Sequence, residues 1–144
     1  MVSERVRRLQ QGAAMTTTAE RVSTWIEAYA TAWRRGDAEA AAALFTEDCL
    51  FRSHPFREPE DARVYARRVL AEETDQRVWF GAPVATDGGR AAVEYWATML
   101  EDGTEVTLAG CCVVRVGADG RCSSLRDYWA TQPGRTPPTE GWGT

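Results

Sequence analysis

Three glycine-containing turn signals divide the second half of the chain into strands. They are Asp87-Gly88-Gly89, Asp102-Gly103 and Asp119-Gly120. Asp-Gly pairs favour tight hairpins because glycine readily adopts the positive φ that such turns require. The runs between them therefore predict an antiparallel meander. Its four strands are expected over residues 77–86, 90–101, 104–116 and 121–132.

The first half of the chain has a helical period instead. Thr17 and Glu20 have the spacing of a capping box, and apolar residues then recur at helical intervals as far as Trp33. Gly36 ends this helix and Asp37 begins a second, alanine-rich one. A short strand is expected over 49–53 and a third helix over 62–70. The fold class is therefore α+β, with three N-terminal helices packed on a curved, mainly antiparallel sheet.

The length of 144 residues fits one domain with a sizeable core. We expect the domain over residues 17–132, a loosely ordered N-terminal extension over 1–16, and a flexible C-terminal tail over 133–144. The net charge of −4 and the absence of a long basic run argue against nucleic-acid binding. No stretch is apolar enough to span a membrane, and no secretory leader is evident, so a cytoplasmic location is expected.

The cysteines do not have the spacing of a metal site. Cys49, Cys111, Cys112 and Cys122 contain no CxxC pair, which argues against structural zinc. We expect buried, reduced thiols, no metal and no cofactor.

Hairpin register assigns the strand residues to two faces. A two-residue turn at Asp102-Gly103 pairs Tyr95 with Gly110, and one at Asp119-Gly120 pairs Cys112 with Asp127. The resulting core face carries a single charged residue, Asp127. A carboxylate among apolar side chains requires a partner or a raised pKa, which makes it a candidate site residue. An ion pair with Arg52 is the structural alternative.

Three short motifs resemble the superfamily of ketosteroid isomerases and SnoaL-like polyketide cyclases, which shares the fold of nuclear transport factor 2. They are the segment from Tyr29 to Asp37, then His54-Pro55-Phe56, and the segment from Asp119 to Trp129. The resemblance spans about residues 18–132 and implies a cone-shaped pocket for a hydrophobic small molecule.

The resemblance also implies roles for individual residues. Tyr29 matches the tyrosine that donates a hydrogen bond to the substrate oxyanion in the isomerases, and His54 replaces their general-base aspartate. Asp127 lies in the region of the cyclases' acid/base carboxylate, so Tyr29, His54 and Asp127 form the expected catalytic set. Cys112 stands where the isomerases have a protonated aspartate, and a thiol is a poor substitute. The expected ligand contacts are Trp25, Arg52, Phe56, Tyr95, Cys112 and Trp129.

Two functions follow from these residues. The first is a cofactor-independent isomerase or cyclase that uses acid–base chemistry on a hydrophobic carbonyl compound. The second is a non-catalytic member of the fold that binds a small molecule or a partner, and an epoxide hydrolase is a further alternative. The second sheet face mixes Trp96, Ala109, Val113 and Tyr128 with polar residues. Relatives dimerise through this face, so a homodimer is expected.

Overall fold

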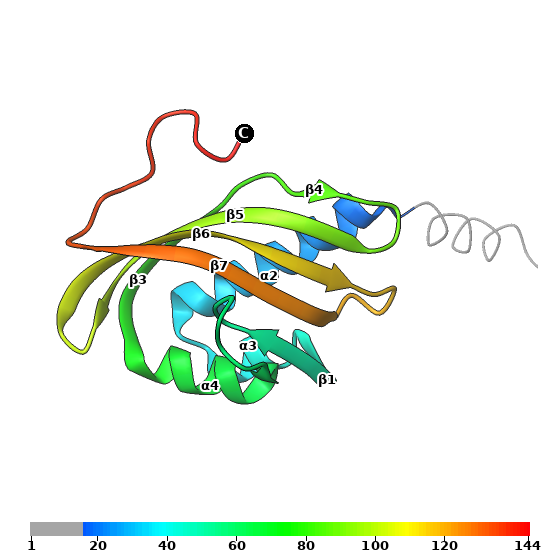
Figure 1. The fold of residues 1–144 in the computed structure, drawn as a ribbon, viewed down its shortest axis with the longest axis horizontal. Coiled ribbons are helices and arrows are strands. Elements are labelled where there is room, and N and C mark those ends of the chain that lie inside the picture. The colour runs from blue at the N-terminus through cyan, green and yellow to red at the C-terminus, as the bar shows by residue number, and fades with distance from the viewer. Residues whose placement is uncertain (1–15) are drawn as a thin grey trace, which may run out of the picture.

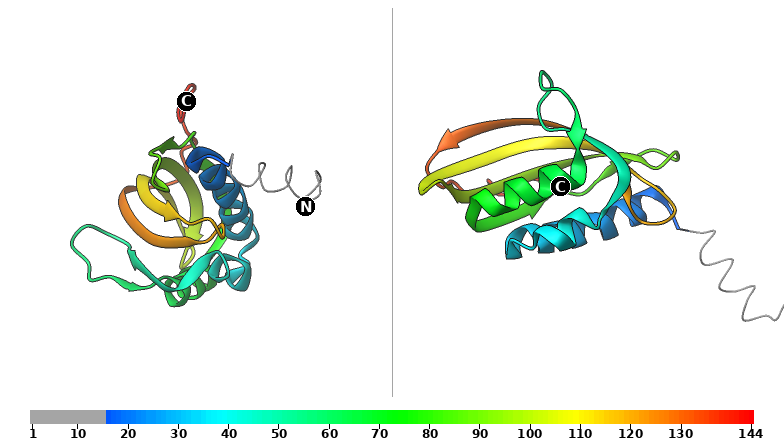
Figure 2. Two further views of the ribbon diagram at one scale, coloured as in Figure 1. Left: turned by 90° about the vertical axis from the view of Figure 1, so that its right-hand side faces the viewer. Right: turned by 90° about the horizontal axis from the view of Figure 1, so that it is seen from below.

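Helices cover one face of a curved sheet, and the other face is free of helices (Figures 1 and 2). This arrangement is seen in a computed structural model, which describes residues 16–144. Apart from Thr16, the predicted N-terminal extension lies outside the described residues. The elements are α2 (Thr18–Arg35), α3 (Ala38–Ala42), β1 (Phe45–Arg52), β2 (Glu60–Asp61), α4 (Ala62–Glu72), β3 (Glu73–Phe80), β4 (Val84–Ala85), β5 (Arg90–Glu101), β6 (Thr104–Val116) and β7 (Cys122–Pro133).

The sheet is mixed, with the strand order β2-β1-β7-β6-β5-β3 and with β4 added beside β5. The meander β5-β6-β7 is antiparallel, as the turn signals predict. Strand β1 joins it in parallel beside β7. Chain segments that are far apart in the sequence, β1 and β7, therefore meet at one edge of the cavity described below.

The predicted register is confirmed at both hairpins. Tyr95 pairs with Gly110, and Cys112 pairs with Asp127. The second turn is looser than a two-residue turn, because the register shifts between Arg115 and Val116. This irregularity lies beyond the predicted pairs, so the assignment of the two faces is unaffected.

Local capping interactions begin and end the helices as the sequence predicts. Thr17 accepts a hydrogen bond from the Glu20 backbone at 3.1 Å, and Glu20 accepts one from the Thr17 backbone at 3.0 Å. Gly36 ends α2 with a φ of 63°, a left-handed conformation that glycine adopts without strain. Asp37 accepts from Ala40 at 3.0 Å and begins α3.

Several element boundaries differ from the sequence prediction, and β3 begins at Glu73, four residues before the expected start at 77. The run 77–86 is not one strand: β3 ends at Phe80 and β4 begins at Val84, since Pro83 has no N–H to donate to a ladder. Strand β1 begins at Phe45, four residues before the strand expected over 49–53. In its strand position, Phe45 is 1% exposed and joins the core.

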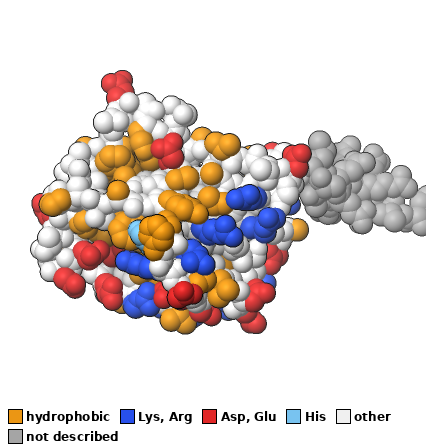
Figure 3. Space-filling view, in the orientation of Figure 1, with side chains coloured by type: hydrophobic (Ala, Val, Ile, Leu, Met, Phe, Trp, Pro, Cys, Tyr) orange, Lys and Arg blue, Asp and Glu red, His pale blue; other side chains and the backbone are white. Residues whose placement is uncertain are grey.

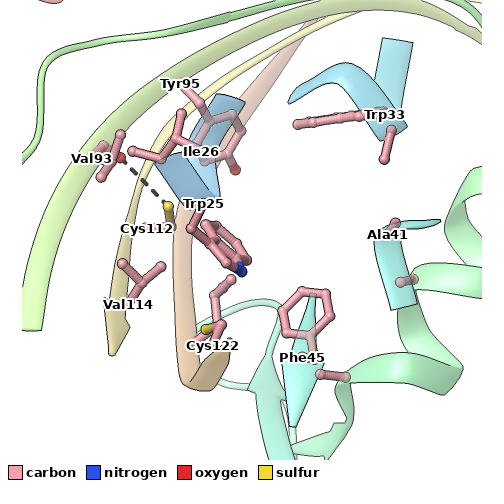
Figure 4. Close-up of a cluster of buried hydrophobic side chains, with 14 of the residues drawn as sticks. Trp25, Ile26, Trp33, Ala41, Phe45, Val93, Tyr95, Cys112, Val114 and Cys122 are labelled. Carbon is pink, nitrogen blue, oxygen red and sulfur yellow. Dashed lines mark hydrogen bonds between the residues drawn. The ribbon is translucent and has the colours of Figure 1, made fainter. Parts of the chain in front are cut away.

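Aromatic side chains of α2 pack against the inner face of the sheet (Figure 4). Trp25 is 2% exposed, stacks on Tyr29 at 4.9 Å between ring centroids, and donates from Nε1 to the Leu44 carbonyl at 2.9 Å. Trp33 lies 6.1 Å from the ring of Tyr95. These contacts connect the long helix to the strands that carry the candidate site.

The C-terminal segment, residues 134–144, runs across the outer face of the sheet. Thr136 accepts a hydrogen bond from Trp96 Nε1 at 2.7 Å and donates from its backbone to Thr107 at 2.9 Å. The Trp142 ring packs edge-on against Trp96 at 6.0 Å, and the Gly143 carbonyl accepts from Ala82 at 2.8 Å. The segment therefore contacts part of the surface through which a homodimer was expected.

Candidate active site

A cavity of about 60 Å³ lies between the helices and the inner face of the sheet. One ordered water requires roughly 10–15 Å³, so the space accepts a compact group. Most of the wall is apolar, as is usual for ligand sites. Its apolar part comes from Phe51, Ala66, Val69, Leu70, Phe80, Leu108 and Leu125.

Asp127 is the polar group that β7 contributes to this cavity. Its Oδ1 accepts a hydrogen bond from the Tyr95 hydroxyl at 2.7 Å, and the partner strand places Cys112 directly beside it. Burial raises the pKa of Asp127 to about 7, although the hydrogen bonds from Tyr95 and from the Tyr128 backbone act in the opposite direction. A carboxyl with this pKa exchanges a proton readily near neutral pH.

Glu73 is a second carboxyl that lines the same cavity. It is 9% exposed and accepts a hydrogen bond from Trp33 Nε1 at 2.6 Å. Burial raises its pKa to about 7, and the charges of Glu101 and Glu72 add to this effect, while the Trp33 hydrogen bond lowers the pKa. The site therefore contains two acid–base groups, one on β7 and one at the start of β3.

Two tyrosines of the helices complete the polar lining. Tyr29 comes from α2 and Tyr65 from α4. Burial raises the pKa of both phenols, and Asp127 and Glu73 raise each further. Within residues 16–144 neither hydroxyl has a hydrogen-bond partner, so both are neutral O–H donors available to a bound molecule.

Cys112 faces the cavity as a thiol and not as an anion. Burial raises its pKa, and the neighbouring Asp127 raises it further. Its Sγ donates to the Val93 carbonyl at 3.7 Å (Figure 4). The thiol therefore belongs to the wall of the cavity and has no nucleophilic form at neutral pH.

Tyr29, Tyr95, Cys112 and Asp127 are thus brought together as expected, whereas His54 and Asp127 are not. His54 Nδ1 accepts from the Phe56 backbone at 3.3 Å, and its ring packs edge-on against Trp129 at 5.5 Å. Strand β1 ends at Arg52, so His54 lies in the following loop, where strand alternation no longer directs its side chain.

The expected ion pair between Arg52 and Asp127 is also absent from the described residues. Arg52 donates to the Arg57 carbonyl at 2.7 Å. Its neighbour Phe51 lines the cavity, and alternation along β1 directs Arg52 away from it. Asp127 consequently has no cationic partner in the described part of the chain, and burial is the largest influence on its pKa.

Besides Arg52, three expected ligand contacts lie outside the cavity wall. Trp25 is part of the core, and Phe56 is 93% exposed in the loop after β1. Trp129 packs under this loop: its Nε1 donates to the Ser53 carbonyl, and the Arg57 guanidinium lies 5.5 Å from its ring. Trp129 therefore connects this loop to β7, two residues beyond Asp127.

Sequence reasoning missed Glu73. It follows Glu72 in a run that resembles a solvated helix end. No local pattern singles it out, because α4 ends at Glu72 and Glu73 is the extended first residue of β3.

The described part of the chain contains no cluster of three metal-ligating side chains. Among its helices, none is long and apolar enough to cross a membrane. The site as described consists of two carboxyls and tyrosine hydroxyls in an apolar wall.

An α+β fold with a cavity between helices and a curved mixed sheet defines a class of small pocket proteins related to nuclear transport factor 2. Within this class, the chain belongs to the SnoaL-like domain family, whose pattern matches residues 26–125. The resemblance seen in the sequence motifs is therefore confirmed. Among curated protein sequences there is no significant match.

Solved structures confirm the fold at low sequence identity. The epoxide hydrolase/cyclase-like enzyme SalBIII, which acts in pyran ring formation in the polyether salinomycin, superposes with a TM-score of 0.69 at 20% identity, over 79% of this chain and 95% of its own. PrhC from Penicillium brasilianum superposes with a TM-score of 0.68 at 17% identity, over 79% of this chain and 83% of PrhC. An LEH-like epoxide hydrolase of M. tuberculosis superposes with a TM-score of 0.65 at 18% identity, over 78% of this chain and 84% of the hydrolase.

Proposed function

We propose that this chain is a cofactor-independent proton-transfer enzyme, an isomerase or cyclase, for a compact hydrophobic carbonyl compound. The observation that supports this most directly is the Asp127 carboxyl, which lies in an apolar wall and has a pKa of about 7. Within residues 16–144, Tyr95 is its only side-chain hydrogen-bond partner. A general base works best when its pKa lies near the operating pH. Asp127 therefore has the protonation behaviour that enolisation requires.

In the proposed reaction, ionised Asp127 takes a proton from the carbon next to the carbonyl. The C–H electron pair moves to form an enolate, whose oxygen accepts a hydrogen bond from the Tyr29 or Tyr65 hydroxyl. Because both hydroxyls are otherwise unpaired among the described residues, they gain a partner only when the ligand is bound. The proton held on Asp127 then returns to a different carbon, which completes isomerisation. Alternatively, the enolate carbon attacks a second carbonyl and the new alkoxide takes the proton from Asp127, which completes an aldol-type cyclisation.

Glu73 gives a specific reason to consider epoxide opening as a second candidate. With two carboxyls of pKa about 7 in one cavity, one can be ionised while the other is protonated. The ionised group would take the proton of an attacking hydroxyl or water, and the protonated group would donate to the epoxide oxygen as its C–O bond breaks. Two of the similar structures carry an epoxide hydrolase name, which is consistent with this chemistry.

The test is proton exchange at carbon in D₂O. Small cyclic ketones and cyclic epoxides serve as probes, and mass spectrometry follows deuterium incorporation and ring opening. We expect exchange by the wild-type chain and a loss of about 10²–10⁴-fold in Asp127→Asn. Glu39→Gln, which alters an exposed carboxyl paired with Arg67, is the matched control. If neither probe reacts and native mass spectrometry detects a co-purifying ligand, the chain is a binding protein instead.

We also propose a homodimer that forms through the part of the outer sheet face around Trp96, Ala109 and Tyr128. Tyr128, 44% exposed, supports this surface as an interface. The residues after 133 already cover Trp96 there, so a second copy must either displace them or pack beside them. Light scattering tests the proposal, and a mass of 16.0 kDa would show a monomer. The expected cytoplasmic location stays a prediction.

A further inference from the structure

Three arginines gather on the outer face of the sheet, on the opposite side from the cavity. Arg90 on β5 pairs directly with Arg115 on β6, and Arg126 on β7 pairs with Val113, two residues from Arg115 on the same face. All three arginines are exposed and line one hollow together with the Ser124 hydroxyl. Basic side chains are seen together over the ends of β6 and β7 in Figure 3.

This arrangement is electrostatically unfavourable without a partner. Like charges that face each other across an antiparallel pair destabilise a sheet, and Arg90 and Arg115 are such a pair. Ion pairs within residues 16–144 involve other arginines, and no carboxylate there lies within 4.0 Å of these three. The chain as a whole is acidic, with a net charge of −4, so the cluster stands out against the overall charge.

The three arginines line the same hollow from neighbouring strands. Adjacent strands are about 4.8 Å apart, so long guanidinium side chains on three neighbouring strands can reach one bound group. Arg115 Nη1 donates to the Gly88 carbonyl at 2.8 Å, which holds this side chain in place, and its other N–H groups have no partner within residues 16–144. Guanidinium groups match phosphate oxygens in bidentate geometry.

We propose that the hollow formed by Arg90, Arg115, Arg126 and Ser124 is a binding site for a phosphate-type oxyanion. Three convergent donors favour a compact multivalent anion over an extended acidic peptide, whose carboxylates are spread along a chain. Val113 and Val114 complete the wall, and no acidic side chain of the described residues lines the hollow. The proposal does not depend on the chemistry assigned to the cavity, because the two sites lie on opposite faces of the sheet.

The test uses the full chain and inorganic pyrophosphate, with inorganic phosphate as a second probe, in isothermal titration at low and constant ionic strength. We expect saturable binding that weakens with added salt. The triple variant Arg90→Gln, Arg115→Gln, Arg126→Gln should bind about tenfold more weakly or not at all, since each charge-assisted hydrogen bond contributes measurably. Arg121→Gln, which removes an arginine paired with Asp119, should bind as the wild type does.

Thermal unfolding provides a second measurement that distinguishes a ligand site from a structural role. Without an anion, the triple variant should unfold at the same temperature as the wild type or a higher one, because like-charge repulsion is relieved. Pyrophosphate should raise the unfolding temperature of the wild type only. The proposal is overturned if the triple variant is less stable in the absence of an anion, if pyrophosphate binding is unchanged in it, or if a hexaglutamate peptide binds while pyrophosphate does not.

Discussion

Replacing Asp127 by Asn should make the protein more stable at neutral pH, by an amount that follows from the raised pKa of the buried carboxyl. Its pKa rises from the ordinary 3.8 to about 7. At 1.36 kcal/mol per pKa unit, full ionisation of the native carboxyl costs about 4 kcal/mol relative to the unfolded chain. Asn keeps the size of the side chain and can still accept from the Tyr95 hydroxyl, so the substitution removes the charge with little change in packing.

The sign of the pH dependence follows from linkage. The pKa of Asp127 is higher in the native state than in the unfolded chain. Its favourable contribution to the free energy of unfolding is therefore fully present below pH 3.8 and is lost as the pH rises to about 7. Between pH 5 and pH 8, the free energy of unfolding of the wild type should fall by about 2–3 kcal/mol relative to Asp127→Asn. Above pH 8 the difference should be constant.

Urea unfolding of both proteins across this range provides the measurement, with the difference between the two curves as the quantity of interest. Taking the difference removes the titration of groups that both proteins share. Glu39→Gln is the control, because its carboxyl is exposed and its pKa is lowered by Arg67, so its difference curve should be flat above pH 5. A flat difference curve for Asp127→Asn would refute the assignment of a raised pKa, and with it the proposed base.

Three further changes test other parts of the structure. Gly110→Ala should destabilise the fold by about 3 kcal/mol or more, measured by urea unfolding, because the added Cβ would lie 2.3 Å from the Tyr128 carbonyl oxygen. His54→Ala should leave carbon-proton exchange within about threefold of wild type, since His54 is not part of the cavity wall; a loss of about 10²-fold would restore it as a base. Removing residues 134–144 exposes Trp96, so light scattering should show an unchanged or larger mass, and a shift from dimer to monomer would make the segment part of the interface.

The amino-acid sequence predicts the meander and its register because short-range chemistry determines both. Glycine turns place the hairpins, and two-residue alternation then assigns every side chain to a face. Asp127, Tyr95 and Cys112 are therefore assigned to the core face by turn chemistry and alternation alone. The same alternation also shows why Arg52 points away: its neighbour Phe51 is the buried residue.

The positions of His54 and Glu73 depend on how the chain turns between elements, which the spacing of apolar residues does not predict. His54 follows the last residue of β1, and Glu73 lies where α4 changes into β3. At Glu73 the backbone becomes extended, with a φ of −97° and a ψ of 139°, so its orientation is a property of the turn and not of either element. A hydrogen bond to Trp33, 40 residues away, then holds the carboxyl at the cavity.

The pleat of β7 allows one strand to serve two chemically distinct sites. Asp127 faces the apolar cavity, where low polarity favours its neutral form, and the preceding Arg126 faces the outer hollow. A one-residue slip of β7 against β6 would bury the guanidinium and expose the carboxylate. Gly110 opposes such a slip, because only a residue without a side chain tolerates the close approach of Trp129 at this register. The close approach of Gly110 and Trp129 therefore favours the one register that places Asp127 at the cavity and Arg126 at the outer hollow.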